Sequence, residues 1–82
     1  MNEDLVVLAV RKPNRTWTRA DGTVVRSYDH ITAYDHGDSV DYHFRGDDVI
    51  TRAQRFARVT GGTIQGERGS WYPYGTRVRV AR

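Results

Sequence analysis

The sequence contains no cysteine. Small secreted domains usually depend on disulfide bonds, so this absence favours a protein that works in a reducing compartment. It also excludes iron–sulfur clusters, cysteine-based zinc fingers and thiol catalysis. We therefore expect a cytoplasmic protein that carries no cofactor.

Long apolar runs are missing as well. The longest, residues 5–10, is far shorter than the roughly 20 apolar residues that a membrane-spanning helix needs. The acidic residues 1–4 before it are unlike the basic start of a signal peptide. We expect no membrane association. The run itself is rich in β-branched residues and predicts a strand buried on both faces, central in the sheet and ended by Pro13.

A catalytic set is not evident either. The chain has 82 residues, which predicts one domain over 1–82 with a thin core and little room for a deep cleft. None of its serines lies in a nucleophile elbow. Asp35, Asp38 and Asp41 gather near one turn, where aspartate commonly bonds to its own backbone. We therefore predict that the protein is not an enzyme.

What the sequence does contain is turn chemistry between β-rich segments. Asp21-Gly22 separates residues 15–20 from residues 23–28 and predicts a hairpin. A two-residue loop would place Trp17 opposite Arg26. A three-residue loop closed by Gly22 in the left-handed region would place Trp17 opposite Val25, and both registers remain open.

A second hairpin joins residues 31–34 to residues 39–44. Tyr34 is predicted to lie opposite Ser39, and Ile31 opposite Tyr42. Alternation then places an apolar set on one face, towards the core, and a polar set on the other face, towards solvent. The apolar set is Ile31, Ala33, Val40, Tyr42 and Phe44; the polar set is His30, Thr32, Tyr34, Asp41 and His43.

One amphipathic helix follows, over residues 48–60, with Asp47 as its expected N-cap and Gly61 as a left-handed C-cap. Residues 63–65 and 76–81 predict further strands; in the last, Val78 and Val80 point inward. Together these elements predict an α+β fold: an antiparallel or mixed sheet of about five to seven short strands, with one helix packed on one face. Phe56 of the helix should lie against the core face of the second hairpin.

The polar face of the second hairpin carries a candidate metal site. The predicted register places His30 opposite His43, with Asp41 diagonal, and such a set can bind zinc, iron or nickel. No fourth ligand is evident, and an exposed sheet face offers no groups to orient the ligands. We therefore predict that His30, Asp41 and His43 hold no specific metal ion.

The positive charge is concentrated in the second half of the chain. Residues 1–44 carry five Arg/Lys and seven Asp/Glu, a net charge of −2, whereas residues 45–82 carry eight Arg and three acids, a net charge of +5. Arginine recognises phosphate and stacks on bases. The candidate nucleic-acid contacts comprise a basic helix face, an aromatic loop with Arg68, and the last strand: Arg52, Arg55, Arg58, Arg68, Tyr72, Tyr74, Arg77 and Arg79. Arg45 could extend this patch.

The aromatic loop, residues 66–75, supports two interpretations. Tyr72 and Tyr74 flank Pro73 and are predicted to be exposed for stacking, whereas Trp71 is predicted to complete the core. Tyr, Trp and Arg also anchor protein interfaces.

We predict a non-enzymatic binding module for an anionic partner, nucleic acid first. The alternative is a small accessory or inhibitory protein, of the kind that phages and mobile elements encode, which binds a protein through this loop and the open sheet face. A homodimer that covers the same face is a further alternative.

Overall fold

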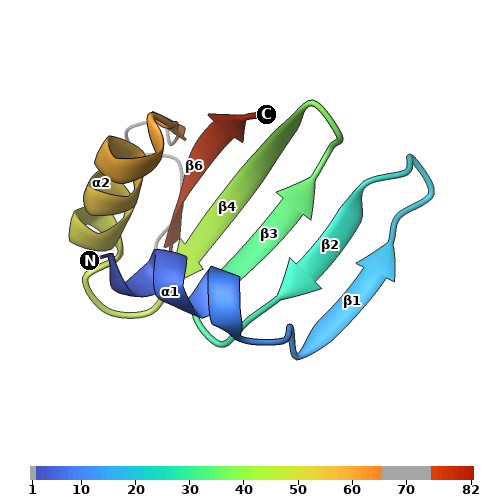
Figure 1. Cartoon of the computed structure of the whole chain (residues 1–82), viewed down its shortest axis with the longest axis horizontal. Coiled ribbons are helices and arrows are strands. Elements are labelled where there is room, and N and C mark those ends of the chain that lie inside the picture. Colours follow the sequence, from blue (N-terminus) through green and yellow to red (C-terminus); the bar gives the residue numbers. More distant parts are fainter. Residues whose placement is uncertain (1, 66–74) are drawn as a thin grey trace.

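The computed structural model describes residues 2–65 and 75–82, and those residues form two helices and six strands (Figure 1). In chain order the elements are α1 (Glu3–Val10), β1 (Arg15–Thr18), β2 (Val24–Ser27), β3 (Ile31–Asp35), β4 (Ser39–Arg45), α2 (Val49–Thr60), β5 (Thr63–Gln65) and β6 (Gly75–Ala81). The strands form one antiparallel sheet in the order β1-β2-β3-β4-β6-β5. The predicted α+β class is confirmed. No helix in the described part of the chain is long and apolar enough to cross a membrane.

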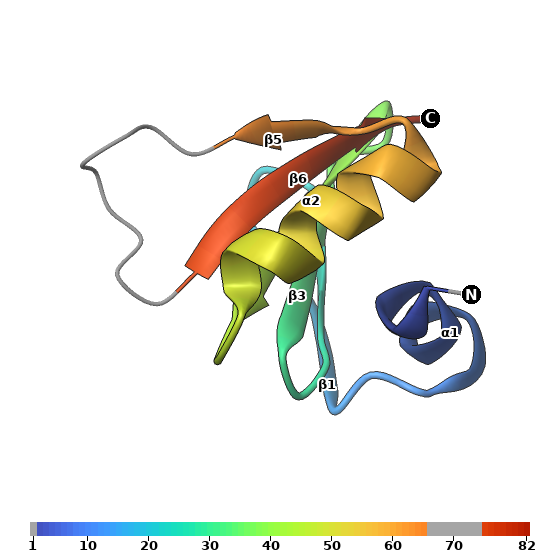
Figure 2. The same cartoon turned by 90° about the vertical axis from the view of Figure 1, so that its left-hand side faces the viewer.

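Both helices lie on the same side of the sheet, where the core is (Figure 2). Phe56 of α2 is fully buried, and its ring packs edge-on against Phe44 at 5.2 Å and against Tyr42 at 4.9 Å between ring centroids. The prediction that Phe56 meets the core face of the second hairpin is confirmed. The buried cluster consists of Tyr28, Ile31, Phe44, Ala53, Phe56 and Val78.

The prediction of a central strand at residues 5–10 is wrong, because these residues belong to α1. The Asn2 side chain caps the helix by accepting hydrogen bonds from the backbone N–H groups of Asp4 and Leu5, at 3.0 and 3.1 Å. Glu3 and Asp4 place negative charge at the positive end of the helix dipole. Leu5 and Leu8 lie three residues apart and pack on the core together. Capping and tertiary burial therefore override the strand propensity of the valines.

The first hairpin adopts the register in which Trp17 pairs with Val25. Gly22 has φ +91°, as the three-residue alternative requires, and its N–H donates to the Arg19 carbonyl at 2.9 Å. The Asp21 carboxylate accepts from the Thr23 N–H at 2.9 Å and so fixes the turn.

The second hairpin differs from its predicted register by two residues. Tyr34 lies opposite Asp41 rather than Ser39, and Ile31 lies opposite Phe44 rather than Tyr42. Asp35 extends β3, and its carboxylate accepts from the Gly37 N–H at 2.9 Å, so the turn begins later than predicted. A shift of two residues leaves every side chain on the same face. The predicted core face is therefore confirmed, although the pairing is not.

Helix α2 begins one residue later than predicted. Asp48, and not Asp47, occupies the N-cap position; it has φ +57° and its side chain makes no capping hydrogen bond. Gly61 ends the helix with φ +74°, which confirms the left-handed C-cap. The strands predicted at 63–65 and 76–81 are present as β5 and β6.

Candidate nucleic-acid interface

The face of the sheet turned away from α1 and α2, here called the open face, is covered by no helix in the described part of the chain (Figure 2). Alternation along each strand decides which side chains it carries. Paired positions share a face, so Trp17, Val25, Tyr34, Asp41 and Arg79 form one row across five strands. The neighbouring row holds Arg15, Ser27, Thr32, His43, Arg77 and Gln65.

Aromatic rings occupy the open face at two places. Trp17 is 38% exposed on the edge strand β1, and the Arg15 guanidinium carbon lies 4.9 Å from the centre of its ring. Further along the same row, the Tyr34 ring lies 4.4 Å from the ring of His43, tilted by 43°. Val25 lies between Trp17 and Tyr34 in the row and is fully buried. The rings therefore form a surface that can stack planar groups.

His43 is uncharged at neutral pH. Burial lowers the pKa of His43 from 6.5 to about 4, and the positive charge of Arg77 acts in the same direction. A neutral imidazole presents a flat ring and one acceptor nitrogen. His43 therefore adds to the aromatic surface rather than to its charge.

One carboxylate lies among the arginines of the open face, and it is tightly held. Arg79 donates from Nε and Nη2 to Asp41 at 2.8 and 2.9 Å. His36 Nε2 lies 3.0 Å from the same carboxylate, and Thr23 Oγ1 lies 3.2 Å from His36 Nδ1. These hydrogen bonds, those from Arg79 first, keep the pKa of the Asp41 carboxyl below its usual range although burial opposes them.

The open face is accordingly positive. It carries Arg15, Arg77 and Arg79 from the two rows, and Arg45 at the end of β4. In the two rows, the only carboxylate among the described residues is that of Asp41, and the charge of Asp38 in the adjoining turn also acts on Arg79. This face was predicted to be polar and directed towards solvent; Thr32 and Asp41 on it are buried, whereas Tyr34 and His43 are half-buried. Its side chains pack laterally on one another and leave arginines and rings at the surface.

The basic face predicted on the helix is not assembled as expected. Arg52 turns toward α1, donates to Asp4 at 2.7 Å and to the Arg45 carbonyl at 3.2 Å, and lies over the Phe44 ring. Only Arg55 and Arg58 of that set are exposed. They project from the outer side of α2, whereas Arg77 and Arg79 lie on the opposite side of the sheet. The structure thus separates residues that the sequence predicts to form one patch.

Three further predicted contacts, Arg68, Tyr72 and Tyr74, lie outside the described residues. The same holds for the predicted burial of Trp71.

The candidate metal ligands are dispersed. His43 lies opposite Thr32, and not opposite His30 as predicted. The His30 carbonyl instead accepts from the Arg45 N–H at 2.9 Å, while Asp41 is occupied by Arg79 and His36. Within residues 2–65 and 75–82, no group of three or more His, Asp or Glu side chains is arranged to hold a metal ion.

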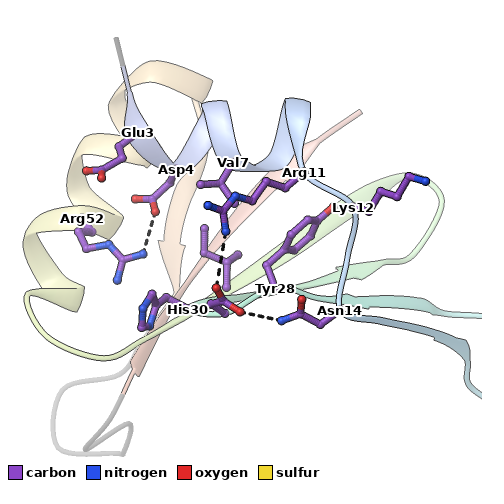
Figure 3. Close-up of a pocket in the computed structure, with 11 residues that line it drawn as sticks. Glu3, Asp4, Val7, Arg11, Lys12, Asn14, Tyr28, His30 and Arg52 are labelled. Atoms are coloured by element: carbon purple, nitrogen blue, oxygen red, sulfur yellow. Dashed lines mark hydrogen bonds and ion pairs between the residues drawn. The ribbon is translucent and has the colours of Figure 1, made fainter.

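A pocket of about 340 Å³ opens on the helix side, between α1, α2 and the turn from β2 to β3 (Figure 3). Its charged groups are largely paired with one another. Arg52 contacts Asp4, Arg11 lies 3.7 Å from Asp29, and Asn14 donates to Asp29 at 2.7 Å. Figure 3 shows Arg52 reaching from α2 toward Asp4 of α1, with Lys12 directed away from both. The Arg52–Asp4 pair joins α1 to α2, whereas Arg11 and Asn14 join the end of α1 and the segment after it to the turn between β2 and β3.

No protein family model, curated protein or solved structure matches this chain.

The residues of the open face that sequence reasoning missed are Arg15 and Trp17. The signal was present: the two share a strand face by alternation, and the Asp21-Gly22 turn offered the register that places Trp17 opposite Val25. Arginine and tyrosine cluster in the sequences of the helix and the aromatic loop, and those clusters predict contacts there. The open face instead brings together arginines and aromatic rings from four separate strands. Because these residues are far apart in the sequence, they form no recognisable motif.

Proposed function

We propose that the protein binds single-stranded nucleic acid on the open face of its sheet. The observation that carries this proposal is the combination of exposed or half-buried rings, Trp17, Tyr34 and His43, with four arginines and one neutralised carboxylate on the same surface. Aromatic rings stack on unpaired bases, and arginines contact the phosphates between them.

The geometry favours a single strand over a duplex. In a duplex the bases are already stacked, and reading their edges requires a helix or ribbon that enters a groove. The element best placed for that role is α2, but its Arg52 is engaged by Asp4. The open face spans from β1 to β6, about 19 Å at the usual strand spacing, and this span suits an extended strand with splayed bases.

The test is a titration of labelled single-stranded DNA, single-stranded RNA and duplex DNA, followed by fluorescence anisotropy at several salt concentrations. We expect both single strands to bind more tightly than the duplex. Trp17→Ala should weaken binding about 5- to 150-fold, because one stacked base contributes about 1–3 kcal/mol. Absence of binding to all three at low salt would refute the proposal.

Variants that remove arginines test which surface of the protein contacts the nucleic acid. The pair Arg15→Gln and Arg45→Gln removes two exposed cations from the open face. The slope of log K against log salt concentration should then become shallower by about 1.4, or about 0.7 for each lost phosphate contact to a single strand. The matched control, Arg55→Gln with Arg58→Gln, removes the same charge from the outer side of α2 and should leave the slope unchanged. If the control variant lowers the salt dependence of binding and the Arg15/Arg45 variant does not, the phosphate contacts lie on α2.

Protein binding is the second candidate function, and the edge of β1 favours it. Among the described residues β1 pairs only with β2, and all four of its residues are exposed. An open strand edge can accept a strand from another chain, or from a second copy of this one. Analytical ultracentrifugation over a wide concentration range distinguishes the homodimer from a monomer.

A further inference from the structure

A second hollow lies on the helix side of the sheet, near the ends of β3 and β4. Its volume is about 260 Å³, and a cavity of about 150 Å³ already admits benzene. Apolar side chains such as Leu8 and Val40 form part of its wall. The polar groups that line it are Arg26, Tyr28, Asp35, Tyr42 and Arg82.

The charges in this hollow do not cancel. Arg26 and Arg82 both contact Oδ2 of Asp35, and the Gly37 N–H donates to Oδ1 of the same carboxylate. The hydrogen bond from Gly37 and the two arginines keep the pKa of the Asp35 carboxyl below its usual range, so it stays ionised at neutral pH. Two guanidinium groups and one carboxylate leave a net charge of +1. Each guanidinium has five N–H donors, and Asp35 accepts only some of them.

Two tyrosine hydroxyls in the hollow have no protein partner among the described residues. Tyr28 is only 8% exposed, and Tyr42 is half-buried. Figure 3 shows the Tyr28 ring rising from the sheet with its hydroxyl directed away from His30 and toward the segment that follows α1. Buried hydroxyls are normally hydrogen-bonded, because an unpaired one destabilises the fold. Two unpaired donors beside a net positive charge are what an anionic ligand would satisfy.

We propose that this hollow binds a small monocarboxylate with an aromatic or short aliphatic body. The carboxylate accepts from Arg26, Arg82 and the tyrosine hydroxyls, and the body lies against Leu8 and Val40. A single negative charge matches the net charge of the hollow. The site lies on the helix side of the sheet and does not depend on nucleic-acid binding at the open face.

The experiment is a calorimetric and NMR titration of the full chain with benzoate and 3-phenylpropionate, with benzamide as the neutral isostere. Saturable one-to-one binding of a carboxylate, with amide shifts confined to the hollow, is expected. Benzamide should bind at least tenfold more weakly, which corresponds to about 1.4 kcal/mol. Equal binding of benzamide, or no binding of either carboxylate, overturns the proposal.

Two conservative variants separate a ligand-binding role from a structural one. Tyr28→Phe and Tyr42→Phe each remove one hydroxyl and keep the ring, so each should weaken carboxylate binding about tenfold. Because neither hydroxyl has a protein partner, thermal stability without ligand should be unchanged or raised. Unchanged binding in both variants, or a lowered melting temperature for Tyr28→Phe, would assign the hydroxyls to the fold and overturn the proposal. Arg55→Gln, on the outer side of α2, serves as the control and should bind as the parent does.

Discussion

The rings of Tyr34 and His43 lie 4.4 Å apart on the open face, on neighbouring antiparallel strands. Tyr34 pairs with Asp41 and His43 pairs with Thr32, so the contact is diagonal across the ladder. The burial that accompanies it keeps His43 neutral. A histidine that could have been a metal ligand or a pH-sensitive cation is therefore part of an aromatic surface, and this has a measurable consequence for stability.

Lowering the pH should destabilise the protein through His43. Its pKa is about 4 in the folded protein and 6.5 in the unfolded chain, so between these values the unfolded state binds the extra proton. Stability contributed by neutral His43 is full above pH 6.5 and is lost as the pH falls toward 4. Between pH 7 and pH 5 the loss should be up to about 2 kcal/mol, measured by urea unfolding at each pH.

His43→Gln is the control for this effect. Glutamine keeps a polar side chain and does not titrate, so the fall in stability between pH 7 and pH 5 should become smaller by the contribution of His43. If the pH dependence of the variant equals that of the parent, other groups carry it and the interpretation of His43 is wrong.

The ion pair between Asp4 and Arg52 should hold α1 to α2. The contact is 2.7 Å long, and both side chains are largely buried, at 11% and 23% exposure. We expect Asp4→Asn to cost about 1–3 kcal/mol, because Arg52 then loses a charged hydrogen-bond partner. Unfolding measurements on Asp4→Asn, Arg52→Gln and the double variant give the coupling energy, and additive effects would show that the pair contributes nothing.

Phe56→Ala should cost about 3–5 kcal/mol, enough to unfold much of a domain this small. The ring is fully buried and contacts both Phe44 and Tyr42, so its removal leaves a cavity in the thin core. Circular dichroism during thermal unfolding measures the loss. Val59→Ala, at an exposed position on the same helix, should change stability little.

The prediction for the aromatic loop stays open. The double change Tyr72→Ala and Tyr74→Ala should leave the melting temperature nearly unchanged and weaken nucleic-acid binding, whereas Trp71→Ala should lower the melting temperature. The same anisotropy titration and a thermal melt decide between these outcomes. Equal destabilisation by both variants would make the loop a cover for the core rather than part of a binding surface.

Local chemistry in the sequence was sufficient for much of the fold. Asp21-Gly22 located the first turn, Gly61 ended α2 with the required positive φ, and alternation in β6 directed Val78 into the core. Each of these depends on one residue's backbone preference or on the side-chain period of a strand, and neighbours along the chain are enough to express it.

Contacts between residues that are far apart in the sequence determined the rest of the fold and the composition of the open face. Residues 5–10 form a helix because Leu5 and Leu8 pack on the core formed by β3, β4 and α2, a tertiary contact that adds to the local cap at Asn2 and outweighs the strand propensity of the valines. Arg52 left the exposed face of α2 because Asp4, 48 positions earlier in the chain, reaches it. The open face was assembled by strand order, which brings Trp17, Tyr34 and Arg79 into one row. The sequence by itself determined which segments form hairpins and which face of each strand is apolar, since those are short-range properties. Contacts between side chains that are distant in the sequence depend on the hydrophobic core, because burial of the core fixes the register and the order of the elements.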